Sequence, residues 1–394
     1  MKKILLASAA IASLAAGAAM AEDVKIGIIL GFTGPIESIT PGMAAGAEMA
    51  IKEVNDSGKF AHGMVAPVRA DSTCIDSGAA TAAAERLVTS DKVAAIVGGD
   101  CSGVTGAMLQ NVARPNGIVM VSPSATSPAL STAEDDGLFF RTAPSDARQG
   151  QVVADILGER GYKSVAITYT NNDYGKGLAD SIQAAFEAAG GKVTINAAHE
   201  DGKADYSAEV GALASAGGEV LVVAGYLDQG GKGIIQASLD AGAFDTFELP
   251  DGMVGDSLPA NIGPGLNGSF GQHPGTDSPG AASYNDMAKA AGFDGTSAFS
   301  PESYDAAALI MLAMQAAGST DSKVFKDNLM AVANAPGEKI YPGELGKALE
   351  IIAGGGDIDY VGASAVELIG GGESAGNYRE IDIKDGAIVT NKYR

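Results

Sequence analysis

Short apolar runs alternate along this chain with longer segments in which apolar residues recur at helical spacing. The apolar runs predict strands at residues 24–30, 65–70, 93–98, 118–121, 164–169, 192–197, 220–224 and 247–249. The longer segments predict helices at residues 42–55, 79–90, 103–114, 148–160, 175–189, 207–216, 231–241, 301–317 and 323–333. Strands that are apolar along their whole length are typical of parallel sheets with helices on both faces. The pattern therefore predicts an α/β protein.

The alternation runs through two successive units. A second unit begins near Pro144, so one doubly wound domain is followed by another. Residues 263–280 are rich in Gly and Pro and indicate a return crossing between the two units. Near the C-terminus, Asp385-Gly386 separates two short apolar stretches, 378–383 and 387–391, which predicts a β-hairpin.

The first residues have the features of a cleaved export signal. Lys2 and Lys3 precede the apolar stretch 4–19, and Ala19-Met20-Ala21 is a small-x-small cleavage pattern that places the cut after Ala21. The stretch is short for a bilayer span, and no cysteine lies near the cut to carry a lipid. No later apolar run approaches a spanning length. We therefore expect an exported, periplasmic protein that is not an integral membrane protein.

The charge of the chain restricts its partners. The 394 residues have a formal net charge of −22, and the predicted signal removes only the two lysines. A surface this acidic repels nucleic acid and anionic lipid. We expect neither as a partner.

The two cysteines, Cys74 and Cys101, favour a single disulfide. An even number of cysteines in an exported protein is typical of a disulfide. A metal or redox pair would need closer spacing or histidine partners, but the three histidines, His62, His199 and His273, are far apart in the sequence. We therefore expect no bound metal.

Polar residues follow several predicted strands, where ligands bind in open α/β sheets. In the first unit these are Ser102, which opens a helix, and Thr126; each could give a hydroxyl and an amide to one anion. In the second unit they are Tyr174, Tyr226 and Asp251. Taken singly, Ser102 is as well explained as an N-cap and Thr126 as a turn residue. Taken together, anion donors on one side and a carboxylate on the other predict a zwitterion site.

These residues resemble a family, the branched-chain amino acid binding proteins of bacterial ABC transporters, which have the type I periplasmic binding fold. The resemblance covers nearly the whole mature chain, and its motifs are Val24-Lys25-Ile26-Gly27, Thr33-Gly34-Pro35, Gly46-Ala47-Glu48, Asn55, Val97-Gly98, Cys101-Ser102, Ser122-Pro123-Ser124-Ala125-Thr126, Tyr174-Gly175-Lys176-Gly177, Gly225-Tyr226 and Asp251-Gly252.

The resemblance implies a role for each matching residue. Ser102 and Thr126 look like ligands of the α-carboxylate. The carbonyl of Ser124 and the side chain of Asp251 look like acceptors for the ammonium. The pocket walls that it implies are Tyr174, Tyr226 and Phe299. Cys74 and Cys101 match the family's disulfide in the first lobe.

The resemblance also implies the architecture and the partners. It predicts two Rossmann-like lobes joined by three crossovers, with residues 22–143 and about 272–345 in the N-terminal lobe and residues about 144–271 and about 346–394 in the C-terminal lobe. The ligand would be a branched-chain or other neutral amino acid, bound as the hinge closes, with no cofactor. A monomer that docks on an ABC permease and its ATPase is expected.

The chain departs from the family pattern at a few positions. Asp100 stands where an apolar residue usually meets the ligand side chain, so it points to solvent, bonds to backbone or meets a polar or cationic ligand. Ile39 and Pro301 replace frequent aromatic residues, and Asp251 replaces the usual glutamate. The tail at 343–377 is longer than in plain leucine binders. These departures leave open a polar, amide or cationic ligand.

Two other function classes were weighed. An exported hydrolase would need a nucleophile beside a base or a pair of carboxylates, and the sequence has no G-x-S-x-G elbow and no histidine beside a suitable serine. Residues 31–34 lack the glycines or lysine of a dinucleotide or P-loop turn. We therefore expect no enzyme. A periplasmic sensor subunit that binds the same ligand remains an alternative, because the sequence does not define the docking surfaces.

Overall fold

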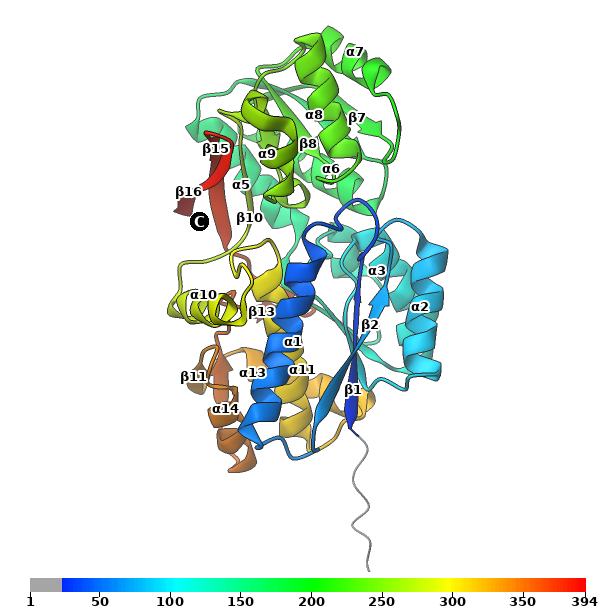
Figure 1. Cartoon of the computed structure of the whole chain (residues 1–394), viewed down its shortest axis with the longest axis vertical. Helices are drawn as coiled ribbons and strands as arrows, with labels where there is room; N and C mark the ends of the chain where they lie inside the picture. The colour runs from blue at the N-terminus through cyan, green and yellow to red at the C-terminus, as the bar shows by residue number, and fades with distance from the viewer. Residues whose placement is uncertain (1–22) are drawn as a thin grey trace, which may run out of the picture.

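The computed structural model describes residues 23–394 as two α/β lobes stacked along the long axis (Figure 1). The predicted signal peptide and its cleavage site after Ala21 lie outside the described residues. Within residues 23–394, no helix is both long enough and apolar enough to cross a membrane.

The first lobe is built on a seven-stranded sheet in the order β13-β14-β5-β4-β3-β1-β2. Its strands are β1 (Val24–Leu30), β2 (Val65–Asp71), β3 (Ala95–Gly98), β4 (Val119–Ser122), β5 (Phe139–Pro144), β13 (Leu368–Ile369) and β14 (Glu373–Ser374). All neighbours are parallel except β13 and β14. Strands β3 and β4 are buried along their whole length, as a sheet covered on both faces requires.

Helices cover both faces of this sheet. They are α1 (Thr40–Ser57), α2 (Ser77–Thr89), α3 (Ser102–Met108), a π-helical turn (Leu109–Ala113), α4 (Arg114–Asn116), α10 (Pro279–Ala291), α11 (Ser300–Ala317), α12 (Ser322–Phe325), α13 (Leu329–Ala333) and α14 (Leu345–Ala353). Helix α11 lies beside α1 and is buried from Glu302 to Gln315, which explains why it is apolar on nearly every side (Figure 1).

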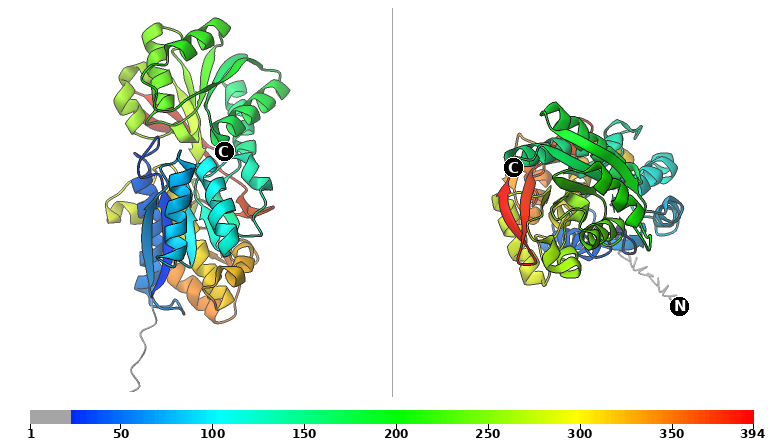
Figure 2. Two further views of the ribbon diagram at one scale, coloured as in Figure 1. Left: turned by 90° about the vertical axis from the view of Figure 1, so that its right-hand side faces the viewer. Right: turned by 90° about the horizontal axis from the view of Figure 1, so that it is seen from above.

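The second lobe repeats this plan with the sheet order β16-β15-β10-β9-β8-β6-β7. Its strands are β6 (Ser164–Thr170), β7 (Lys192–His199), β8 (Val220–Ala224), β9 (Phe247–Leu249), β10 (Phe270–Pro274), β15 (Tyr378–Lys384) and β16 (Ala387–Tyr393). Its helices are α5 (Asp146–Glu159), α6 (Asp173–Ala188), α7 (Ser207–Ala216), α8 (Gly230–Ala241) and α9 (Ser257–Ile262). The hairpin β15–β16 closes one edge of this lobe (Figure 2). The predicted α/β fold of two doubly wound lobes is confirmed.

The third crossing between the lobes lies later than the sequence suggested. Residues 346–394 were predicted to belong to the second lobe, but β13 and β14 pair within the first sheet, so the prediction is wrong for 346–374. The chain crosses only between Ser374 and Tyr378. The first two crossings follow β5 and β10, two strands that the sequence analysis did not identify.

One buried carboxylate and one half-buried carboxylate hold the long tail on the first lobe. Asp305 of α11 accepts hydrogen bonds from the Tyr360 hydroxyl at 2.8 Å, from the Ala363 amide at 2.7 Å and from Ser364. Glu53 of α1 accepts from the Leu345 amide at 2.7 Å. The tail carries a small parallel pair, β11 (Glu338–Ile340) and β12 (Ile358–Tyr360). These bonds explain why this segment stays on the first lobe instead of crossing.

The predicted disulfide is present between Cys74 and Cys101. It joins the loop after β2 to the start of α3, across a separation of 27 residues. Both cysteines are buried.

Replacing both cysteines by alanine is expected to lower the free energy of unfolding by about 3 to 4 kcal/mol, because a loop of this size regains chain entropy when the bond is absent. Urea unfolding of the oxidised protein and the double variant measures the difference, and dithiothreitol-treated wild type is the matched control. Equal midpoints for all three samples would contradict a stabilising role.

Candidate functional site

A pocket lies between the lobes, at the carboxyl ends of the strands of both sheets. Its empty space is about 300 Å³, including the part that is open to solvent. It is lined by Ile36, Ile39, Asp100, Cys101, Ser102, Ser124, Tyr174, Tyr226, Asp251, Gly252 and Phe299. The pocket thus lies where ligands bind in open α/β sheets, beyond the carboxyl ends of the strands. Seven of the eight predicted site residues line this pocket; Thr126 does not.

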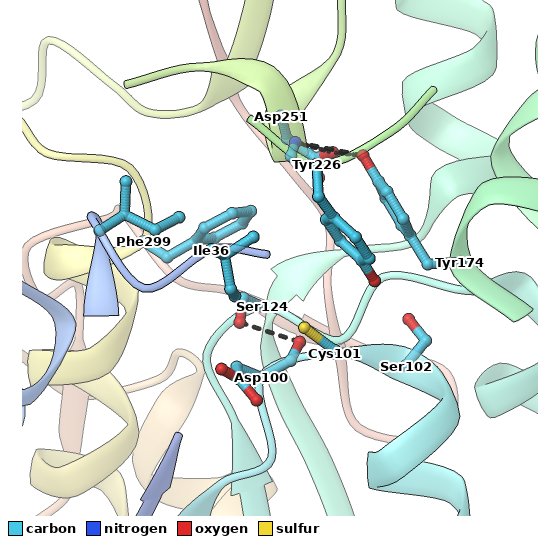
Figure 3. Close-up of a pocket in the computed structure, with 11 residues that line it drawn as sticks. Ile36, Asp100, Cys101, Ser102, Ser124, Tyr174, Tyr226, Asp251 and Phe299 are labelled. Carbon is cyan, nitrogen blue, oxygen red and sulfur yellow. Dashed lines mark hydrogen bonds between the residues drawn. The ribbon is translucent and has the colours of Figure 1, made fainter. Parts of the chain in front are cut away.

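The second lobe contributes a buried acid held by a tyrosine. The Tyr174 hydroxyl donates to Asp251 Oδ1 at 2.6 Å, and the Gly252 amide donates to the same oxygen at 2.7 Å (Figure 3). Asp251 Oδ2 is buried and has no hydrogen-bond partner among the described residues. Burial raises the pKa of Asp251, and its hydrogen bond from Tyr174 opposes that shift. The second oxygen is therefore available to a donor in the pocket.

Backbone packing places this acid. Gly252 has no side chain, and a Cβ there would lie 2.6 Å from the Gly225 carbonyl and 2.7 Å from the Tyr174 hydroxyl. Tyr226 stacks on Tyr174 with ring centroids 5.1 Å apart and an angle of 15°. The Asn172 amide donates to the Tyr226 hydroxyl at 3.4 Å. The two rings form one wall of the pocket (Figure 3).

The first lobe presents hydroxyls and the start of a helix. Ser102 is the first residue of α3 and is 2% exposed, and its Oγ accepts from the Ser127 amide at 3.1 Å. The hydroxyl proton remains available, and the first turn of a helix leaves its N–H groups without intrahelical partners. The Ser124 hydroxyl donates to the Asp100 carbonyl at 3.1 Å. This side of the pocket suits an anionic group.

Thr126 lies beside the pocket instead of on its wall. It is completely buried, and its hydroxyl has no hydrogen-bond partner in the described chain. Its carbonyl accepts from the Asp146 amide at 2.8 Å, across the first crossing between the lobes.

Asp100 turns its carboxylate away from the two tyrosines (Figure 3). Its oxygens accept from the Gly31 amide and from the Ser72 hydroxyl, the latter at 2.8 Å. Burial raises its pKa, and these two bonds oppose the shift. Of the three alternatives that the sequence left open for Asp100, the structure shows bonding to backbone. Its carboxylate fastens the loop after β1 instead of facing the pocket.

Apolar side chains form the remaining walls. Ile36 and Ile39 come from the loop after β1, and Phe299 precedes α11. Phe299 has a φ of 62°, a left-handed conformation that is unusual for a bulky residue. The site thus has one apolar part and one polar part, and can hold a small molecule with an anionic end, a cationic end and an apolar side chain.

The sequence analysis did not name Ile36 and Gly252 as site residues, and it named Ile39 only as a replacement for a frequent aromatic residue. An apolar residue directly after the Thr-Gly-Pro turn could have indicated a wall. Asp146, which starts α5, is completely buried close to Asp251. An aspartate in the first turn of a helix is ordinary cap chemistry, so no sequence feature distinguished it.

No group of three or more His, Cys, Asp or Glu side chains arranged to hold a metal ion occurs among residues 23–394.

Two α/β lobes that enclose a small polar and apolar pocket define a two-lobed solute-binding protein. A model of the periplasmic binding protein family matches residues 23–341. The chain belongs to this family.

Curated relatives agree with this assignment. A leucine-, isoleucine-, valine-, threonine- and alanine-binding protein of Pseudomonas aeruginosa is 30% identical over 83% of this chain and 87% of its own length. A Leu/Ile/Val-binding protein homologue of Brucella melitensis is 32% identical over 82% of this chain and 86% of its own.

Solved structures share the fold at lower identity. A leucine-binding protein of Thermotoga maritima has a TM-score of 0.79 at 21% identity, covering 94% of this chain and 98% of its own. A solute-binding protein of R. palustris in complex with benzoate has a TM-score of 0.77 at 18% identity, covering 94% of this chain and 96% of its own. These likenesses show that the chain shares its fold with solute-binding proteins.

The position of Asp100 leads to a prediction about stability. Asp100→Asn replaces one acceptor oxygen by an NH₂ group that faces the Gly31 amide or the Ser72 hydroxyl. It should lower the free energy of unfolding by about 1 to 3 kcal/mol, because a buried donor loses its acceptor. Chemical unfolding measures this loss, and ligand preference should stay that of wild type. A variant of unchanged stability with an altered ligand preference would place this carboxylate on the ligand.

Proposed function

We propose that this chain is the binding component of an ABC importer and captures an aliphatic α-amino acid between its lobes. The observation that carries the proposal is that two complementary groups face one pocket. Ser102 and the start of α3 lie on one lobe, and Asp251, with one carboxylate oxygen lacking a hydrogen-bond partner in the described chain, lies on the other. A molecule with both a carboxylate and an ammonium satisfies both sides at once. The curated relatives named for leucine, isoleucine and valine support the same ligand class.

Each site residue receives a role in this proposal. Ser102 holds the α-carboxylate, and the unpartnered hydroxyl of Thr126 makes that residue the second candidate donor. The carbonyl of Ser124 and the carboxylate of Asp251 accept from the ammonium. Tyr174 holds Asp251 in place.

The walls account for the ligand's side chain. Ile36, Ile39 and Phe299 enclose an apolar part of the pocket, with Tyr226 opposite. Apolar surface removed from water there contributes about 25 cal/mol per Å². A polar or cationic ligand was kept open because of Asp100, and the bonds of Asp100 to Gly31 and Ser72 remove the reason for it. An aliphatic side chain is therefore the better match.

Capture would proceed by closure of the lobes. The loop after β1 already contacts the second lobe: the Asp228 amide donates to the Pro35 carbonyl at 3.0 Å, and the Ser38 amide donates to Asp228 Oδ2 at 2.9 Å. A ligand that touches both lobes favours the closed state by its differential contacts. The closed form would then dock on a permease and its ATPase, after export to the periplasm with cleavage behind Ala21. Binding and release complete the cycle, with no chemical step on the ligand.

The carboxylate contact is tested by Ser102→Ala. Loss of a buried hydroxyl donor should weaken the binding of leucine by about 1 to 3 kcal/mol. It should weaken the binding of the keto acid of leucine equally, because both ligands carry the same carboxylate. Isothermal calorimetry measures both affinities. Wild-type affinity for both ligands would remove Ser102 from the carboxylate site.

The ammonium contact is tested by Asp251→Asn with the same two ligands. The variant should lose about 1.5 to 3 kcal/mol in leucine affinity, the value of a hydrogen bond to a charged group, and little for the keto acid, which has no ammonium. Together the two variants distinguish the residue that contacts the carboxylate from the residue that contacts the ammonium. Equal losses for both ligands would show that Asp251 does not contact the ammonium, and no binding of any amino acid by the wild type would overturn the proposed function.

A further inference from the structure

A second buried carboxylate lies behind the pocket, where the chain crosses between the lobes. Asp146 begins α5 directly after the first crossing, and Tyr378 begins β15 directly after the third. With Thr126, Gln149 and Asp251 they form a group that we call the hinge cluster. All five side chains are at most 1% exposed.

Many polar atoms of the hinge cluster lack a hydrogen bond of good geometry. Thr126 still lies near enough to Asp146, and Gln149 near enough to Asp251 and Tyr378, to lower the pKa of those groups. Both carboxylate oxygens of Asp146, one of Asp251, the Thr126 hydroxyl, the Gln149 amide and the Tyr378 hydroxyl have no hydrogen-bond partner in the part of the chain that the structure describes. An ionised carboxylate that is buried without donors is costly, so the protonation state of this group depends on the charges around it.

The two carboxylates are close enough to interact. Burial raises the pKa of Asp146 well above its usual range, and repulsion from Asp251 raises it further. Gln149 lies near enough to Asp251 to lower the pKa of that carboxyl, although its amide makes no hydrogen bond of good geometry. Two like charges at one buried site are not both ionised unless a cation joins them.

The surrounding charges supply no such cation. Arg141 of β5 is the cation that lowers the pKa of Asp146, but its guanidinium already donates to the Ala125 and Ser127 carbonyls and to Glu373. Arg148 of α5 is exposed and acts on Tyr378.

The other titratable groups that face the pair are neutral or acidic. Asp251 raises the pKa of each of them, and they are Tyr174 of α6, Tyr226 after β8, Tyr378 of β15 and Glu248 of β9. The pair therefore has a site for one positive charge.

We propose that the Asp146–Asp251 pair carries one proton while the cleft is empty and releases it to the solvent when the ligand's ammonium arrives. This inference rests on the proposed function and adds a regulation to it: capture of an α-amino acid is coupled to loss of a proton. The charge at the pair is the same before and after binding. The ammonium keeps its own three protons and replaces the positive charge that the shared proton supplied.

The sign of the pH dependence follows from linkage. The pKa of the pair is raised in the empty protein and lowered beside the ammonium, so the loaded form binds fewer protons. Affinity for leucine is therefore highest above the raised pKa and falls by up to about tenfold per pH unit as the pH drops through it. Acid conditions favour release.

Isothermal calorimetry in phosphate and in Tris, which have different ionisation enthalpies, counts the protons released. Leucine binding to the wild type should release up to about one proton and weaken as the pH is lowered from about 8 to about 5. The keto acid of leucine has no ammonium and should release none. Leucine binding with no proton transfer and a constant affinity over this range would overturn the inference while leaving the proposed function standing.

Two variants identify the group that loses the proton. Asp146→Asn should still bind leucine but release no proton. Glu302→Gln is the matched control, because Glu302 is a buried carboxyl outside the hinge cluster whose pKa burial raises to about 8, and its release should equal that of wild type. Full release by Asp146→Asn, or loss of release only in Glu302→Gln, would assign the proton elsewhere and contradict the inference.

Discussion

The burial of a carboxylate with one unpartnered oxygen is the constraint on which the cleft depends. Asp251 has one oxygen bound by Tyr174 and Gly252 and the other without a partner in the described chain. An unpaired buried charge is costly in any protein. In the proposed function an ammonium takes the place of the proton that the empty site holds, and this gives a ligand with that group a reason to bind between the lobes.

Several interactions in the first lobe hold the segments that form its side of the pocket. The disulfide and the carboxylate of Asp100 both fasten segments that border the pocket: the bridge holds the start of α3, and Asp100 holds the loop after β1. That loop carries Ile36 and Ile39 into the apolar part of the site and also contacts Asp228 of the second lobe. One loop thus both lines the pocket and contacts the other lobe, as the proposed closure around a ligand requires.

The sequence predicted the elements with strong patterns and missed those without them. Fully apolar strands, the long helix α11, the hairpin at Asp385-Gly386 and the disulfide were all predicted, because each has a local pattern in the sequence. Strand β10 was taken for a crossing, since its sequence at 270–274 contains Gly, His and Pro. The late third crossing depends on Glu53 and Asp305, whose partners lie hundreds or tens of residues away and leave no local trace.

The candidate site shows the same division. Residues at strand ends, such as Ser102 and Asp251, could be found because sheet topology alone brings those ends together. The direction in which Asp100 points could not, because it depends on the Gly31 amide and the Ser72 hydroxyl from two other segments. Asp146 could not either, since only the packing of the hinge turns a helix-cap aspartate into half of a buried pair.

The most direct test of this account is a crystal structure of the mature protein with leucine. The account predicts electron density for one leucine in the pocket, with its carboxylate at Ser102, its ammonium on the unpartnered oxygen of Asp251 and its side chain against Ile36 and Ile39. Leucine bound outside this pocket, or bound in it with the ammonium directed away from Asp251, would contradict it.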